Sequence, residues 1–419
     1  MEATAFAVVA AVVFLWGAVS ARMERADLTA PIVFTAVGVV VAGVGLMPGT
    51  VAPETLKPLL DVTLVWVLFA DAARVRVHDL RGDLGMVVRL LAVGLPLTLL
   101  AGWGLAAWLL PGLGVWLALL VGAALAPTDA ALGVPVVTNP VVPSRVRRLI
   151  TVESGLNDGI ATPVVLVAVA GAASMAEVDE WGAGSALVEL AIGAAIGGAV
   201  GYAGGWLLRW ARERGWAAED FVGVAVLALA LLSYLVALSV HGNGFVAAFC
   251  GGIAFGAAAG RRGPAELVFL EQTSGAVSLL VWLAFGAIAV PIMLDRLDWA
   301  RLLYAVLSLT VIRMVPVALA LIGAGLDRKT VLFVGWFGPR GLASLVFALL
   351  ALEQLGADAD GAVAVIAATV LLSVVAHGIS ASPLAARYGR SVAAGAGEEE
   401  PGDPIPDVPV RGLPRPRAR

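Results

Sequence analysis

Long apolar stretches restrict this 419-residue chain to one broad class of fold. Hydrophobic residues make up 60% of the sequence, whereas soluble domains contain about 45–50%. A helix needs about 20 mostly apolar residues to cross the hydrocarbon core of a bilayer. The sequence therefore predicts an all-α membrane protein that crosses the bilayer many times. We predict thirteen spans, near residues 3–20, 28–46, 58–75, 84–109, 113–138, 147–172, 184–208, 219–240, 243–259, 266–290, 300–325, 329–352 and 360–384.

The distribution of Arg and Lys between these spans indicates how the chain is oriented. Seventeen of them fall in alternate loops and three in the opposite loops. Because cytoplasmic loops are enriched in Arg and Lys, we predict an external N-terminus and a cytoplasmic C-terminus. Arginine far outnumbers lysine, as is typical of high-GC bacterial genomes, so the bacterial inner membrane is the expected location. The seventeen lie at residues 22–25, 74–81, 145–148, 209–214, 261–262, 328–329 and 387–390.

The composition changes near the end of the chain. From about Gly389 the sequence becomes rich in Gly, Pro and Glu, and such a segment cannot bury enough apolar surface to fold. We therefore predict a transmembrane domain over residues 1–385 and a disordered cytoplasmic tail over 389–419.

Two of the predicted spans are interrupted beside charged residues. In the fifth span Pro127 is followed at once by Thr128 and Asp129, and the twelfth contains Gly338-Pro339-Arg340-Gly341. Such breaks free backbone carbonyls and helix ends to coordinate a cation. Pro and Gly also kink membrane helices merely for packing. Two charged breaks in matched spans favour the functional interpretation.

The breaks occupy corresponding positions if the chain consists of two inverted repeats. The repeats would cover about residues 1–172 and 219–385, joined by a linking helix at 184–208. The fifth and twelfth spans would then be discontinuous helices that cross at the bilayer midplane. The acid of one break and the base of the other would balance the opposing half-helix dipoles.

The sixth span carries two pairs of polar residues on different helix faces. Glu153 and Asn157 are four residues apart, as are Ser154 and Asp158, and the two faces differ by about 100°. We expect Asp158 and Ser154 to face a cavity. Glu153 is expected to pair with Arg313 of the eleventh span, because buried charges are tolerated as a pair and are costly singly. The alternative is that Glu153 extends to the cytoplasmic surface.

Other ionisable residues give weaker signals. Asp71 ends the third span and could be an interfacial acid paired with Arg74. Glu189 and Glu271 lack polar companions, so we interpret both as structural or interfacial. The isolated histidines predict neither a metal site nor a proton path: His78, His241 and His377.

In order and spacing, these motifs resemble the sodium/proton exchangers of the NhaP/NHE type over about residues 1–385. The resemblance implies thirteen helices in two inverted repeats, a core domain that carries the ion, and a second domain that forms a homodimer interface. It also implies a cation site, a structural charge pair of Glu153 with Arg313, and Arg340 at the helix crossover. The implied ion-binding residues are Asp158, Asp129, Thr128, Ser154, Asp71 and Asn157.

One motif near the site matches a particular branch of this family, and two positions differ from the usual family pattern. The order Asn157-Asp158 resembles the electroneutral branch, whereas the electrogenic branch carries two adjacent aspartates. Ala130 follows Asp129 where the family often has proline, and the third-span acid is Asp71 where glutamate is frequent.

These residues predict a secondary transporter that exchanges Na⁺ or Li⁺ for H⁺ in a 1:1 ratio, with a role in pH homeostasis. A buried carboxylate binds either a proton or a cation, and competition for Asp158 couples the two gradients. Carboxylate, hydroxyl and carbonyl oxygens suit a hard alkali cation. We expect a homodimer in the lipid bilayer, without a cofactor and without a nucleic-acid partner.

Three alternatives remain open at this point. Residue types do not set cavity size, so the chain could exchange K⁺ for H⁺. A cation channel would need a filter or repeated rings of charge, and no such repeat is visible. A membrane-embedded hydrolase could use Glu153 or Asp158 as a general base but would need His or Cys partners at fixed spacing, which these spans lack. We therefore predict a transporter and not an enzyme.

Overall fold

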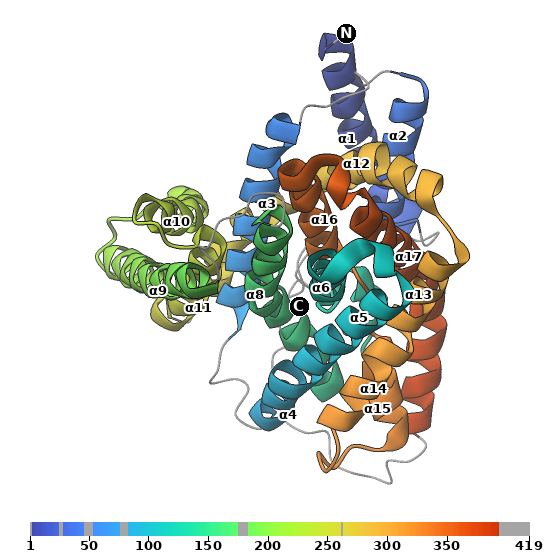
Figure 1. The fold of residues 1–419 in the computed structure, drawn as a ribbon. Helices are drawn as coiled ribbons and strands as arrows, with labels where there is room; N and C mark the ends of the chain where they lie inside the picture. Colours follow the sequence, from blue (N-terminus) through green and yellow to red (C-terminus); the bar gives the residue numbers. More distant parts are fainter. Residues whose placement is uncertain are drawn as a thin grey trace.

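Helices make up the body of the molecule (Figure 1). The computed structural model describes residues 2–24, 28–45, 53–75, 83–174, 183–260 and 263–393. The last helix continues to Ala393, so the first residues that we assigned to the tail are helical. The rest of the predicted tail and His78 lie outside the described residues, as do five of the loop arginines used for the orientation: Arg25, Arg76, Arg81, Arg261 and Arg262.

Within the described part of the chain, the helices fall into thirteen groups that coincide with the predicted spans. The first six groups are α1 (Glu2–Glu24), α2 (Ala30–Gly43), α3 (Pro53–Arg74), α4 to α5 (Leu84–Arg89, η2 Leu90–Gly94, Leu95–Leu109), α6 to α7 (η3 Pro111–Leu113, Gly114–Ala124, η4 Ala130–Gly133, Val134–Val137) and α8 (Ser144–Ser174). The other seven are α9 (Ala183–Glu213), α10 (Glu219–Ser239), α11 (Gly244–Ala258), α12 (Gly263–Arg296), α13 to α14 (Trp299–Leu309, Val311–Ala320), α15 to α16 (Arg328–Trp336, Leu342–Leu355) and η5 to α17 (Gly356–Ala359, Asp360–Ala393).

Length and composition support a membrane location for these helices. Seven described helical stretches are long and apolar enough to span a bilayer, and four shorter apolar helices accompany them. The chain is a multi-pass, all-helical membrane protein, as predicted.

The eleventh span differs from the single helix predicted at 300–325. It is divided at Thr310, whose backbone angles are φ −108° and ψ −90°. In a continuous helix the carbonyl of Ser308 would pair with the amide of Ile312. In the structure this carbonyl accepts a hydrogen bond from Arg340 Nη2 at 3.4 Å. The break thus supplies a backbone hydrogen-bond acceptor to the buried side chain of Arg340. No Pro or Gly stands at Thr310 or beside it, so the sequence gives no sign of this break.

Glycines set the close packing of α3, α11 and α9, which lie side by side (Figure 1). Gly197 and Gly201 are four residues apart on α9, and a Cβ on either would lie 2.1 Å from a backbone oxygen of α11. On the other side of α11, a Cβ at Gly252 would lie 2.4 Å from the carbonyl oxygen of Phe69 in α3. Small residues at this spacing let membrane helices approach closely. This packing fixes α3, whose C-terminal turn carries Asp71.

Candidate ion-binding site

The interrupted parts of the fifth and twelfth spans are in contact with each other, and we call this place the crossing. The chain leaves the α-helical form after Ala124 and again after Trp336. At the crossing, the backbone N–H of Asp129 donates to the carbonyl of Pro339 at 2.8 Å. The two breaks are therefore in contact, and the helix ends beside them have backbone groups that need partners outside the helix.

Arg340 satisfies the carbonyls at this crossing. Its side chain is fully buried, and Nη1 donates to the carbonyls of Ala126 and Pro127 at 2.5 and 3.0 Å. These carbonyls follow the C-terminal end of α6, where the helix dipole places partial negative charge. The guanidinium thus stabilises the end of a half-helix.

Asp129 accepts hydrogen bonds from backbone amides, one of them at the N-terminal end of α16. Its Oδ2 accepts from the N–H of Leu342 at 3.1 Å, and its Oδ1 accepts from the N–H of Ala131 at 2.8 Å. A carboxylate is favoured at a helix N-terminus, where the dipole is positive. The acid thus lies at a helix N-terminus and the base at the carbonyls that follow a helix C-terminus, the positions that compensation of the dipoles requires.

Gly341 is required for this contact. A Cβ at this position would lie 2.3 Å from Asp129 Oδ2. We expect Gly341→Ala to displace Asp129 and to lower the free energy of unfolding by about 1–3 kcal/mol. Gly133→Ala is a matched control, because a Cβ there meets nothing within 4 Å. Thermal unfolding of both purified variants tests this, and equal melting temperatures would contradict it.

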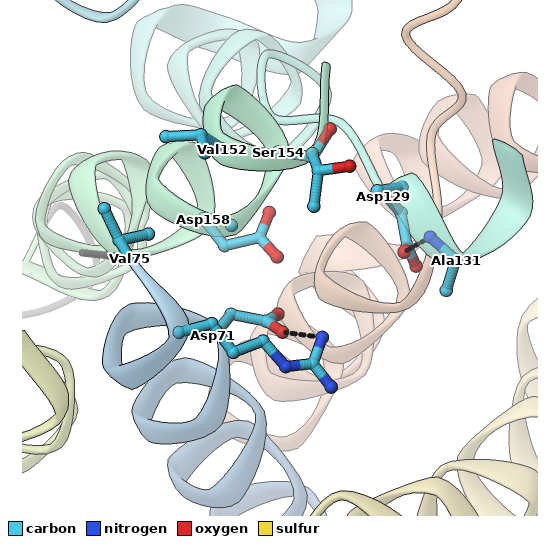
Figure 2. A pocket seen from close by; sticks show the side chains of 11 residues that line it. Asp71, Val75, Asp129, Ala131, Val152, Ser154 and Asp158 are labelled. Carbon is cyan, nitrogen blue, oxygen red and sulfur yellow. Dashed lines mark hydrogen bonds and ion pairs between the residues drawn. The ribbon is translucent and has the colours of Figure 1, made fainter. Parts of the chain in front are cut away.

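A small cavity lies beside the crossing and brings four predicted ion-binding residues together (Figure 2). It measures about 30 Å³, enough for a water-sized occupant. Asp71 from α3, Asp129 from the crossing, and Ser154 and Asp158 from α8 line it, and Asp71 and Asp158 face each other (Figure 2). The lining thus includes three carboxylates, the hydroxyl residues Ser154 and Thr151, and the cation Arg74.

Thr128 and Asn157 lie outside the lining of this cavity. Thr128 Oγ1 is hydrogen-bonded to Ser154 Oγ at 2.9 Å and accepts from Asn157 Nδ2 at 2.8 Å. All three side chains are buried. They link α8 to the fifth-span break and orient the Ser154 hydroxyl.

Glu153 and Arg313 form the predicted ion pair. Arg313 Nη1 and Nη2 donate to the two carboxylate oxygens of Glu153 at 2.6 and 2.8 Å, and both residues are 1% exposed. Because Glu153 is buried, the alternative that it extends to the surface is wrong. A Cβ at Gly338 would lie 2.5 Å from Arg313 Nε, so the pair also contacts the twelfth-span break.

Sequence reasoning missed two features near the site. His377 was predicted to be isolated at a span end, but it is buried, with Nε2 2.9 Å from the carbonyl of Trp336. Its neighbour Ser373 accepts from the backbone N–H of Arg340 at 2.7 Å. The spacing of Ser373 and His377, four residues apart, was the available signal, since it places both on one helix face.

The second missed feature is an ion pair at the cavity wall. Glu271 of α12 accepts from Arg74 Nε at 2.8 Å, and Arg74 Nη1 lies 3.7 Å from Asp71 Oδ1. Asp71 therefore combines both interpretations of its sequence position, as a partner of Arg74 and as a residue of the cavity.

Comparison with known proteins agrees with this architecture. Residues 8–387 match the family model described as sodium/hydrogen exchanger, transmembrane. The structure is similar to that of the sodium proton antiporter MjNhaP1 from Methanocaldococcus jannaschii at pH 8, with a TM-score of 0.74 and 22% identity, covering 93% of this chain and 100% of that one. At this identity the similarity concerns the fold.

Curated relatives extend the comparison at low identity. The chain is 28% identical to the K(+)/H(+) antiporter NhaP of Alkalimonas amylolytica, over 92% of this chain and 67% of that protein. It is 26% identical to the K(+)/H(+) antiporter NhaP2 of Shewanella sp. (strain MR-4), over 82% of this chain and 59% of that protein. A protein of Schizosaccharomyces pombe named "Probable Na(+)/H(+) antiporter" is also 26% identical, over 71% of this chain and 41% of that protein.

The chain thus spans between 41% and 67% of the length of these relatives. The family model, in contrast, covers nearly the whole described part of the chain. This chain belongs to the sodium/hydrogen exchanger family, a family of membrane transporters and not of enzymes.

Proposed function

We propose that this chain is a monovalent cation/proton antiporter that exchanges Na⁺ or Li⁺ for H⁺. The observation that carries the proposal is the cavity in which Asp71, Asp129, Ser154 and Asp158 meet. Hard alkali cations prefer oxygen ligands, and buried carboxylates favour a positive occupant because they repel one another. Either a cation or protons can neutralise them, which couples the two gradients.

We assign the exchanging carboxylate to Asp158. Glu153 is held by two hydrogen bonds from Arg313, so its charge is balanced within the protein. Both oxygens of Asp129 accept hydrogen bonds from backbone amides at the crossing, so its carboxylate already has partners within the protein. Asn157 has an amide group that donates to Thr128. Unlike a carboxylate, this group neither takes up nor releases a proton during transport. These fixed partners support a cycle in which one proton is exchanged for one cation, without net charge movement.

Exchange of K⁺ for H⁺ is the second candidate. It is favoured by the names of two relatives, the K(+)/H(+) antiporters of Alkalimonas amylolytica and Shewanella. The lining residues are compatible with either ion, because the same oxygen ligands bind both.

The packing supports a division into two moving parts. Helices α4 to α8 pack with α13 to α17, and α2 and α3 pack with α9 to α12. Across this division, α12 packs on α16 and α17, and α3 packs on α16. The cavity lies between α3 of one group and α8 of the other. Movement of one group against the other would expose the site alternately to the two sides of the membrane. The homodimer, the external N-terminus, the inverted repeats and the bacterial inner membrane stay predictions.

Transport by the purified protein in proteoliposomes tests the proposal. Na⁺, Li⁺ and K⁺ are added separately to vesicles that hold an imposed pH gradient, and internal pH is followed by fluorescence. We expect Na⁺ and Li⁺ to dissipate the gradient more strongly than K⁺, and protein-free vesicles to show no response. A response to K⁺ alone would establish the second candidate. No response to any of the three cations would contradict antiport.

A further inference from the structure

Arg74 is a buried cation in the wall of the cavity. Its side chain is 7% exposed and belongs to the last residue of α3. The guanidinium has two acidic neighbours, with Nε 2.8 Å from Glu271 Oε1 and Nη1 3.7 Å from Asp71 Oδ1 (Figure 2 shows the Asp71 pair). Its Nη2 is buried without a hydrogen-bond partner in the part of the chain that the structure describes.

These distances distinguish the two acids. Glu271 makes a hydrogen bond of ordinary length with Arg74, whereas Asp71 Oδ1 lies 3.7 Å from Arg74 Nη1, beyond hydrogen-bond distance. Asp71 lines the cavity, and Glu271 lies outside it. Arg74 is therefore hydrogen-bonded to Glu271 outside the cavity, while its positive charge lies near Asp71 in the cavity wall.

The charge of Arg74 is permanent, because guanidinium does not lose its proton in proteins. A cation that enters the cavity must then share Asp71 with a positive group that never leaves. A neighbouring charge within about 4–6 Å changes the affinity of a carboxylate for a proton by about tenfold or more. The positive charge of Arg74 repels an alkali cation bound at Asp71 in the same way as it repels a proton.

We propose that the fixed positive charge of Arg74 lowers the affinity of the cavity for the transported ion. In this proposal Glu271 binds the guanidinium of Arg74 and keeps it away from Asp71. Both are positioning residues that act through Asp71. The inference rests on the proposed antiport, since it concerns the occupant of the same cavity. It predicts that neutralising the two residues of one ion pair has opposite effects.

The test is the apparent KM for Na⁺, or for K⁺ if the wild type exchanges K⁺, in proteoliposomes at a fixed pH near 8.5, where proton competition is weak. Arg74→Gln should lower KM about tenfold, because the positive charge of Arg74 beside Asp71 is then removed. Glu271→Gln should raise KM about threefold, the order expected when one hydrogen bond that holds the guanidinium is weakened. A KM that moves in the same direction in both variants would overturn the proposal.

The double variant separates an effect through Arg74 from direct attraction of cations by Glu271. If Glu271 acts through Arg74, Arg74→Gln with Glu271→Gln should have the low KM of Arg74→Gln alone. A KM raised again by about threefold in the double variant would show that Glu271 acts on the ion directly, against the proposal. The double variant removes both members of the Arg74–Glu271 hydrogen bond together, so it provides a measurement if a single variant does not fold.

A second ion pair serves as the control. Arg212 of α9 contacts Glu266 of α12, and neither lines the cavity. Arg212→Gln with Glu266→Gln removes one buried pair from the same helix α12 and should leave KM unchanged. Failure of the wild type to exchange any cation would refute the antiport itself, whereas exchange with an unaltered KM in all Arg74 and Glu271 variants would refute only this inference.

Discussion

Replacing Asp158 by Asn should abolish cation-driven proton movement and leave the protein folded. The amide keeps the shape of the side chain but can neither release a proton nor offer a full negative charge to a cation. Asp158 lines the cavity beside Ser154, one helical turn away on the same face of α8. We expect the rate in proteoliposomes to fall to that of protein-free vesicles.

Asp295→Asn is the matched control for this prediction. Asp295 is an exposed residue near the end of α12, away from the cavity. The same substitution there should retain transport and the melting temperature of the wild type. Proton movement driven by Na⁺ or K⁺ in a folded Asp158→Asn variant would show that the exchanging carboxylate lies elsewhere.

Loss of the Glu153–Arg313 pair should have the largest effect on stability. Glu153→Ala leaves Arg313 buried and without its two carboxylate hydrogen bonds. Stranding a buried charge in this way costs about 3–5 kcal/mol of the free energy of unfolding. The double variant, Glu153→Ala with Arg313→Ala, should recover part of this loss because it removes both charges. Thermal unfolding of the two single variants and the double variant measures the coupling.

A purely additive result would contradict this account of the pair. If the loss in the double variant equals the sum of the two single losses, the residues do not stabilise each other despite their contact. If the double variant recovers the melting temperature but does not transport, the Glu153–Arg313 pair is also needed for transport itself.

Local spacing was enough to predict much of the site. On α8, the helical period placed Ser154 and Asp158 on one face and Glu153 on another, and the structure has this division. The partner of Glu153 followed from the cost of a buried charge, since Arg313 needed an acid. The proximity of the fifth and twelfth spans was expected from their two charged breaks, and the backbone of Asp129 does contact that of Pro339.

Contacts between distant segments could not be predicted in the same way. Arg74 and Glu271 are 197 residues apart, and no local pattern around Glu271 marks it as a partner of a residue in the cavity wall. The division of the eleventh span at Thr310 arises where Arg340 takes a backbone carbonyl, a tertiary contact that overrides the local helical preference. His377 was missed for the same reason, since its acceptor, the carbonyl of Trp336, belongs to another helix.

The central claim is that one carboxylate exchanges one proton for one cation, and the dependence of transport on membrane potential tests it most directly. Vesicles containing the protein are given a fixed Na⁺ gradient and a series of potentials set with valinomycin and K⁺, and the pH gradient that stops net proton flux is determined. Each net charge moved would contribute about 2.3 kcal/mol per 100 mV. The account predicts that this pH gradient equals the Na⁺ gradient at every potential. A balancing pH gradient that shifts with the potential would show that a second proton travels, and would contradict the assignment of exchange to Asp158 alone.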